Sequence, residues 1–390
     1  MSKPLWEPPR LRTGNETAEE ERHATWLELF YDLIFVVAVA ELGHTFGKHV
    51  TWLGFAQFVG LFIPVWWCWV GATFYATRFD TDDLGHRVLT LMQMFVVAIM
   101  AVTVHDGFGE TAVGFALCYI AVRMILIFKY LRAGYHVPIA RPLTTIFAIG
   151  FGLSVALWLL SIFVPPPWRF ALWAIAMGID LATPIVAGRS FQQVPPHMAH
   201  VSERLGLFTI IVLGESVVGV VRGISGQDLG LFAGETGLLG LIIAFSLWWI
   251  YFDSVDASPL EAYRQGRFLA GVIWLYTHLL LVIGLAATGV GVYHLIFSDP
   301  NVPVPGAERW LMSGALALCF LALGVLHWIT VSLGHPRQRT LIAGIRFATA
   351  AFLVVLAIAG TRIYPITLIL ILAIVSMGQV VLDLIIKPRP

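Results

Sequence analysis

Charged residues are scarce in this chain of 390 residues. Asp, Glu, Lys and Arg make up 12% of it, whereas a soluble domain has about 25%. Hydrophobic residues make up 58%, and the mean hydropathy is +0.82. The shortage of charge extends over the whole length, so the composition excludes an ordinary water-soluble protein and indicates one embedded in lipid.

The chain also lacks a net charge, because 24 Lys and Arg balance 24 Asp and Glu. Nothing in this balance points to a highly charged partner, and we predict no nucleic-acid partner. Cysteine is limited to Cys68, Cys118 and Cys319, each inside an apolar run. These three are too few and too scattered for a disulfide framework or a metal cluster.

Familiar catalytic motifs are missing too: there is no nucleophile elbow, no phosphate-binding loop and no HExxH zinc motif. We therefore predict no cofactor and favour a protein without enzymatic activity, and we leave metal binding open. Residues 1–25 are polar and lack the apolar core and cleavage site of a signal peptide. The first hydrophobic segment should therefore remain in the protein.

What the sequence does contain is a series of apolar runs of the length that crosses a bilayer as a helix, about 20 residues. They predict an all-α, polytopic membrane protein with about twelve transmembrane helices. The predicted spans are 26–46, 52–75, 87–105, 111–131, 143–164, 168–188, 205–222, 232–252, 268–292, 310–332, 341–360 and 365–386.

The basic residues outside the deep spans alternate in phase with the predicted loops. Seventeen Lys and Arg fall in the termini and even-numbered loops, and five fall in the odd-numbered loops. Since cytoplasmic loops carry the excess of Lys and Arg, both termini should be cytoplasmic. This count includes Lys129, Arg132 and Arg204 as loop residues. Arg346, one turn from the predicted cytoplasmic edge, is expected to reach the interface with its long side chain.

Short stretches recur about 180 residues apart, which predicts two tandem parallel six-helix repeats. "PVWWCWVGATFY" (64–75) matches "FSLWWIYFD" (245–253), and "LELF" (27–30) matches "LGLF" (205–208). Their tryptophans should pack helices or line an aromatic cavity. The predicted organisation is a polar amino-terminal segment (1–25), a first repeat (26–188), a cytoplasmic linker (189–204), a second repeat (205–386) and a short tail (387–390).

The first span carries acidic residues that lipid disfavours. Glu28 and Asp32 are four residues apart and therefore share one helix face. Glu41 is nine residues beyond Asp32, on roughly the opposite face, near His44. Charged residues within a membrane usually face a partner or water and mark function, so Glu28, Asp32 and Glu41 are candidates for a proton, cation or substrate site.

The seventh span carries Glu215 near its middle, next to Gly214, which would let a backbone or a ligand approach the carboxylate. Arg123 and Asp180 are also deep, and His278 lies in the middle of the ninth span. Arg123 could neutralise Asp180, Asp32 or Glu215, in which case the cluster only fixes packing. One deep cation against three acids would still leave surplus carboxylates able to bind protons or cations.

The stretches "WLELFYDLIFVVAVAEL" (26–42), "RFDTDDLGHRVLTLMQMFVVAIMA" (78–101), "ERLGLFTIIVLGESVVGV" (203–220), "WWIYFD" (248–253) and "WLYTHLLLVIGLAATGVG" (274–291) resemble the bacterial low-temperature-requirement A (LtrA) family. The resemblance implies a multi-pass protein of the bacterial plasma (inner) membrane, and no substrate. The positions that match the family's polar residues are Glu28, Asp32, Asp80, Asp82, Asp83, Arg87, Glu203, Glu215, Asp253 and His278. Those near the cytoplasmic loops, together with Arg204, would form a gate or polar loop motif.

The function that these features favour is a transporter or ion conductor that uses intramembrane carboxylates as proton or cation sites. Its partners would be the lipid bilayer and a small solute, cation or proton, and homo-oligomerisation is left open. The alternatives are an integral membrane enzyme acting on a lipid-soluble substrate, and a membrane sensor or scaffold in low-temperature growth.

Overall fold

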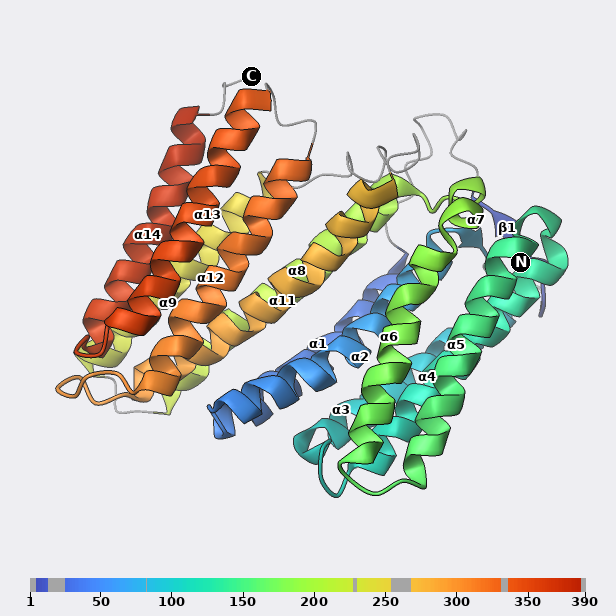
Figure 1. The fold of residues 1–390 in the computed structure, drawn as a ribbon, viewed down its shortest axis with the longest axis horizontal. Helices are drawn as coiled ribbons and strands as arrows, with labels where there is room; N and C mark the ends of the chain where they lie inside the picture. Colours follow the sequence, from blue (N-terminus) through green and yellow to red (C-terminus); the bar gives the residue numbers. More distant parts are fainter. Residues whose placement is uncertain are drawn as a thin grey trace. The chain divides into compact units, whose positions relative to one another are not determined.

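The computed structural model describes residues 5–12, 25–81, 83–226, 230–253, 268–330 and 336–386. These residues form an all-α protein with twelve long helices (Figure 1). The helices are α1 (Trp26–Lys48), α2 (Trp52–Ala76), α3 (Leu84–Thr103), α4 (Ala112–His136), α5 (Arg141–Ile162), α6 (Trp168–Val186), α8 (Met198–Ser225), α9 (Leu231–Phe252), α11 (Phe268–Phe297), α12 (Gly306–Ile329), α13 (Pro336–Ala359) and α14 (Pro365–Ile386). The shorter elements are β1 (Arg10–Leu11), β2 (Phe79–Asp80) and α7 (Gly188–Gln193), with single 3-10 turns at Val104–Asp106 and Pro138–Ala140.

The helices have the length and composition of membrane spans, and the protein is a polytopic membrane protein. Among the described residues, eleven helices are long and apolar enough to cross a membrane. The twelfth long helix is α1, which carries Glu28, Asp32 and Glu41. A helix satisfies its own backbone hydrogen bonds, and in lipid no water is available to do so, which is why apolar runs of this length become helices.

Each predicted span corresponds to one long helix, and the largest differences are at polar ends. The fourth helix continues to His136, five residues past the predicted end, and α8 begins at Met198 rather than at residue 205. Hydropathy finds the apolar part of a helix, but the backbone bonds continue into polar sequence. Lys129, Arg132 and Arg204, predicted to be loop residues, therefore lie inside helices.

The chain forms two compact units. The first comprises Met1–Leu42, Gly60–Arg204 and Tyr263–Phe268, and the second comprises Gly43–Val59, Leu205–Ala262 and Leu269–Pro390. In the first unit, α3 packs on α4, α4 on α5 and α5 on α6; in the second, α12 packs on α13 and α9 on α14. The twofold sequence repeat stays a prediction.

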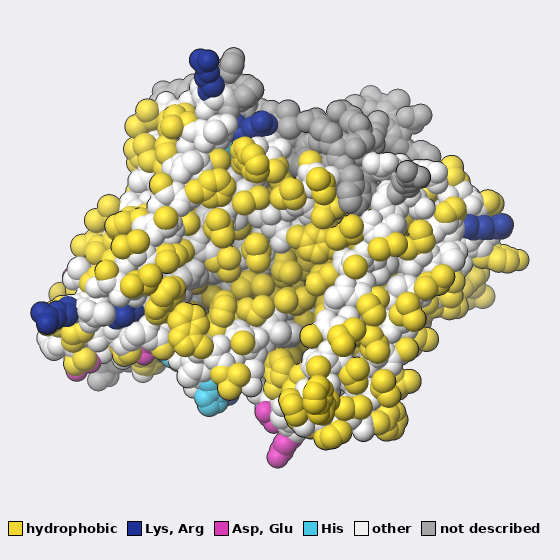
Figure 2. Space-filling model, viewed as in Figure 1, with side chains coloured by type: hydrophobic (Ala, Val, Ile, Leu, Met, Phe, Trp, Pro, Cys, Tyr) yellow, Lys and Arg dark blue, Asp and Glu magenta, His cyan; other side chains and the backbone are white. Residues whose placement is uncertain are grey.

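The outer surface of the helices is apolar, as lipid contact requires. Large hydrophobic side chains cover the visible face of each unit, and the few charged side chains lie toward the edges (Figure 2). On α5, Ile149 and Leu153 are 59% and 55% exposed, whereas Phe147 and Phe151 are buried against neighbouring helices. One helix thus presents one apolar face to lipid and another to the protein.

Close helix packing in the second unit depends on a glycine of α11. A Cβ at Gly289 would lie 3.0 Å from the Cα of Ser216 on α8. Gly214, by contrast, has no described atom of another helix within 4 Å of its Cβ position. Close backbone approach, one of the two roles predicted for Gly214, belongs instead to Gly289.

The first unit also holds a short amino-terminal segment, residues 5–12, which we call the strap. β1 pairs antiparallel with β2, with Arg10 opposite Asp80, and Trp6 lies over the guanidinium of Arg132 at 3.8 Å. A Cβ at Gly85 would come within 2.1 Å of the Trp6 ring, so only glycine leaves room for Trp6 there. The strap is therefore part of the folded unit, although it precedes the first span by more than ten residues.

Candidate functional site

A buried ionic cluster joins α1, α2 and α8 within the first unit. We call Glu28, Asp32, Trp69, His200 and Arg204 the inner cluster. The guanidinium of Arg204 lies 2.6 Å from Asp32 Oδ1 and 3.6 Å from Glu28 Oε1. Trp69 Nε1 donates to Asp32 Oδ1 at 2.7 Å, and His200 Nε2 lies 3.5 Å from Glu28 Oε2. The four-residue spacing of Glu28 and Asp32 did predict their shared face, since one arginine contacts both.

The inner cluster shows that the prediction of one deep cation against three deep acids was wrong. That prediction set Asp32, Asp180 and Glu215 against one deep cation, but Arg204 is 1% exposed and pairs with Asp32. The longer α8 brings Arg204 to the depth of Asp32. Glu28 also differs from a solvated helix start: it is 9% exposed, and it accepts a hydrogen bond from the Thr25 backbone N–H at 2.8 Å.

A second buried pair lies on α4 and α6. Arg123 Nε is 3.4 Å from Asp180 Oδ2, with both side chains fully buried. Tyr119 donates its hydroxyl hydrogen to Asp180 and accepts from Arg123 Nη2 at 2.8 Å. Of the three acids proposed as partners for Arg123, the structure pairs it with Asp180. The pair joins α4 to α6 inside the first unit.

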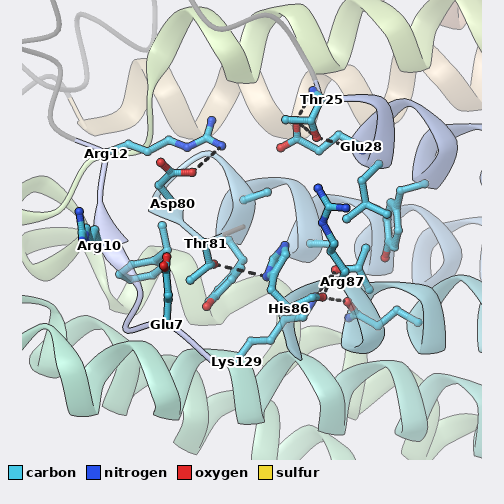
Figure 3. Close-up of a pocket in the computed structure, with 18 of the residues that line it drawn as sticks. Glu7, Arg10, Arg12, Thr25, Glu28, Asp80, Thr81, His86, Arg87 and Lys129 are labelled. Carbon is cyan, nitrogen blue, oxygen red and sulfur yellow. Dashed lines mark hydrogen bonds and ion pairs between the residues drawn. The ribbon is translucent and has the colours of Figure 1, made fainter. Parts of the chain in front are cut away.

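A polar pocket of about 450 Å³ lies beside the inner cluster in the first unit (Figure 3). Its wall includes Glu28 and Arg204 of the inner cluster, but the deeper Asp32 does not line it. The strap contributes Glu7, Arg10 and Arg12, and Arg12 lies 3.7 Å from Asp80 of β2. A pocket of this volume has the size of a small-molecule site, and it leads to a buried ion pair within the membrane unit.

Lys129 forms another wall of this pocket, from α4 (Figure 3). It is 4% exposed, and its Nζ donates to Gln93 Oε1 at 2.7 Å and to Thr90 Oγ1 at 3.0 Å, both on α3. Sequence reasoning missed this residue because it counted Lys129 as a loop cation. Its position two turns before the end of α4 was the available signal, since the apolar run continues around it.

Asp83 holds the strap to the helices. It caps α3 by accepting from the His86 backbone N–H, accepts from the Glu7 backbone N–H at 2.7 Å, and pairs with Arg132 of α4. Burial alone would raise the pKa of the Asp83 carboxyl, but the hydrogen bonds from Glu7, His86 and Arg132 outweigh burial and lower it below the ordinary value. The ionised form is therefore the one that fastens the strap.

This geometry predicts that Asp83→Asn loosens the strap at neutral pH. The variant loses one ion pair and a charge-assisted hydrogen bond, worth about 1.5–3 kcal/mol. Trypsin should therefore cut after Arg10 and Arg12 roughly tenfold faster or more. Mass spectrometry of the fragments over time measures the rate. Asp106→Asn is the matched control, because Asp106 accepts the Glu110 backbone N–H in another loop. Equal cleavage of Asp83→Asn and wild type would contradict this role.

Acid should release the strap in the wild-type protein. Because the folded-state pKa of Asp83 is lowered, its stabilisation is fully present above the ordinary aspartate pKa of about 3.9. It is lost as the pH falls below that value, when the carboxyl becomes protonated. Fluorescence of a dye attached beside Trp6 should report release below about pH 4, and Asp83→Asn should remove that transition.

The other predicted residues of the first unit lie apart from the inner cluster or outside the described residues. Glu41 is half-buried, toward the other end of α1. Asp80 and Arg87 line the pocket, and Glu203 precedes Arg204 on α8 with its side chain half-buried. Asp82 lies outside the described residues.

In the second unit, the predicted residues are in separate places. Glu215 is half-buried in the middle of α8, and Asp253 ends α9. His278 is buried, with Nε2 3.1 Å from the Tyr251 hydroxyl and Nδ1 2.7 Å from the Trp274 carbonyl oxygen. The contact with Tyr251 of α9 is the interhelical hydrogen bonding common for polar side chains in membranes, and the contact with Trp274 lies within α11.

Arg346 corrects another expectation, since it is fully buried rather than extended to the interface. Its Nη2 lies 2.6 Å from Asp383 of α14, and its Nη1 lies 2.9 Å from His327 Nδ1 of α12. The spacing of charges along one helix gave no sign of this pair, because Asp383 is a neighbour only in space.

Comparison with known proteins gives one family and one relative. The family model described as "Bacterial low temperature requirement A protein (LtrA)" matches residues 23–376. An uncharacterised protein of Rhizobium meliloti (strain 1021), RA0937, is 25% identical over 387 residues, covering 93% of this chain and 90% of the relative. The match includes every long helix from α1 to α13 and most of α14.

Proposed function

This chain belongs to the bacterial low temperature requirement A (LtrA) family, and from the polar pocket in its first unit we propose that it is a transporter of small polar solutes in the bacterial plasma membrane. The observation that carries the proposal is the pocket of about 450 Å³ whose wall includes the buried pair of Glu28 and Arg204. Ionisable residues within a membrane commonly mark substrate or proton pathways.

Glu28 is the acid of the inner cluster that a solute in the pocket could contact. Its side chain is 11% exposed and lines the pocket, whereas that of Asp32 is 2% exposed and does not. If a solute group displaced Glu28, Arg204 would remain bound to Asp32. Its guanidinium would then have donors available on its pocket side, so solute binding would be coupled to the Glu28–Arg204 ion pair.

The geometry gives less support to a cation pathway along bare carboxylates. Asp32 and Asp180 are each paired with an arginine, and a cation entering either site would have to displace that arginine. We therefore assign the acidic residues a coupling role and the pocket the role of the solute site.

Flux through proteoliposomes tests this proposal. Wild-type protein should move at least one class of small polar solute faster than empty liposomes do. We expect Glu28→Gln to slow that flux about tenfold, because one charged hydrogen bond of about 1.5–3 kcal/mol corresponds to a factor of ten or more. Glu110→Gln, an exposed acid in the α3–α4 loop, is the control and should leave flux unchanged.

The panel should include small anions, cations, neutral polar solutes and protons. If wild-type liposomes match empty ones for every member, the protein is not a transporter of this kind. If wild-type flux occurs and Glu28→Gln has the same flux as Glu110→Gln, the transport proposal is supported and the coupling role of Glu28 is wrong.

A further inference from the structure

Lys129 is a buried cation whose described hydrogen-bond partners are neutral. Its ammonium has three N–H donors, and two of them reach Thr90 Oγ1 and Gln93 Oε1. Within the part of the chain that the structure describes, no carboxylate lies within ion-pair distance of Nζ. Buried charges are usually paired, and among the described residues the Lys129 ammonium has no acidic partner.

The neutral partners fix where the ammonium can bind. Thr90 donates its own hydroxyl hydrogen to the His86 carbonyl oxygen at 2.8 Å, so its oxygen is held toward Lys129. Two acceptors on α3 therefore hold the ammonium at the pocket wall, and the third N–H is left for another ligand. Such an arrangement orients a cation without neutralising it.

The described side chains that line the pocket carry more positive than negative charge, as Lys129 does. Five described side chains of its wall are basic and three are acidic. The basic residues are Arg10, Arg12, Arg87, Lys129 and Arg204, and the acidic ones are Glu7, Glu28 and Asp80. Two of the acids already face arginines, since Glu28 faces Arg204 and Asp80 faces Arg12.

Tyr31 supplies an independent sign of a ligand. It lines the same pocket and is 3% exposed, and its hydroxyl has no hydrogen-bond partner among the described residues. A buried hydroxyl without a partner is destabilising, and a ligand oxygen in the pocket would supply the missing hydrogen bond. Tyr75 and Phe79 add an aromatic wall, suited to the carbon part of an organic solute.

We propose that the pocket binds a small soluble anion through a carboxylate or phosphate group, with the Lys129 ammonium as its principal charged ligand. This inference rests on the proposed transport function and names the class of its solute. Carboxylate and phosphate oxygens accept hydrogen bonds, as Lys129 and Tyr31 both require, and they supply the missing negative charge. A lipid headgroup has the same chemistry and is the source that the experiment has to separate from a soluble anion.

Binding should be measured by calorimetry on the full-length protein in neutral-lipid nanodiscs, with inorganic phosphate and succinate as probes and ethylenediamine and glycerol as cationic and neutral controls. We expect saturable binding of phosphate, succinate or both, and none of the controls. Lys129→Met should weaken binding about tenfold or more. It preserves length and removes a buried charge, so the fold should be retained, which thermal unfolding checks.

Lys48→Met is the matched variant, because Lys48 is an exposed lysine in the last turn of α1, and it should bind like wild type. Lys129→Arg keeps the charge and should bind more tightly than Lys129→Met. The inference would be overturned if neither phosphate nor succinate binds, or if Lys129→Met binds them as tightly as wild type does. A Lys129-dependent change seen only in nanodiscs with phosphatidylglycerol would also overturn it and assign the site to a lipid headgroup.

The result separates this inference from the transport proposal. If the protein binds anions but shows no flux in proteoliposomes, the transport proposal is wrong and the anion-binding site is still supported. If only cations or neutral solutes are transported, and Lys129→Met transports them as wild type does, the transport proposal is supported and the proposal of an anionic solute is wrong.

Discussion

Replacing Arg204 with methionine should leave the carboxylates of Glu28 and Asp32 buried without their guanidinium. Breaking a buried ion pair by removing one partner costs about 3–5 kcal/mol. Because Arg204 contacts both acids, we expect Arg204→Met to lie at the upper end of that range. The measurements are the yield of monodisperse protein extracted from membranes and the midpoint of thermal unfolding in detergent.

Neutralising the two acids separates lost charge pairing from lost packing. The triple variant Arg204→Met with Glu28→Gln and Asp32→Asn should recover most of the lost stability, since it buries no bare charge. Arg222→Met is the control on the same helix, because Arg222 is exposed in the last turn of α8. An Arg204→Met protein as stable as wild type would mean that the inner cluster does not hold α1 to α8.

Arg123→Met should destabilise the first unit by a similar amount, about 3–5 kcal/mol. The Asp180 side chain is fully buried, and its described partners are Arg123 and the Tyr119 hydroxyl. Thermal unfolding should show a large loss for Arg123→Met and a smaller one, about 1–3 kcal/mol, for Tyr119→Phe.

The double variant Arg123→Met with Asp180→Asn tests whether the pair serves only helix packing or also takes part in transport. If the pair only packs helices, the double variant should regain stability and transport as wild type does. Recovered stability with lost transport would give Asp180 a place in the transport path. If the double variant is no more stable than Arg123→Met alone, charge pairing is not what Arg123 contributes.

The helices were predictable from sequence because their cause lies within each segment. A run of about 20 apolar residues has to satisfy its backbone internally in lipid, so hydropathy finds it. The shared face of Glu28 and Asp32 was predictable for the same reason, since it depends only on helix geometry. The LtrA motif residues likewise identified the family that the whole-chain match confirms.

The sequence left Arg123–Asp180 open as one of three pairings, and it gave no sign of the Arg204–Asp32 and Arg346–Asp383 pairs. Which acid meets which arginine depends on which helices are neighbours. Arg204 and Asp32 are separated by 172 residues, and Arg346 and Asp383 by 37. Hydropathy is one-dimensional and assigns no lateral order to helices. Lys129 was missed for a related reason: charge counting treats a lysine near a span end as a loop residue, whereas α4 continues around it and buries it.

The strap has a consequence for how the protein is made. Trp6 and Glu7 are translated before the first helix, but Arg132, which contacts both, follows 125 residues after Glu7. At about 5–20 residues per second, the ribosome reaches Arg132 roughly 6–25 seconds later. The pocket wall that residues 5–12 form is thus completed only after the fourth helix has emerged, so a segment made before the first helix has to wait for the fourth before it can reach its place.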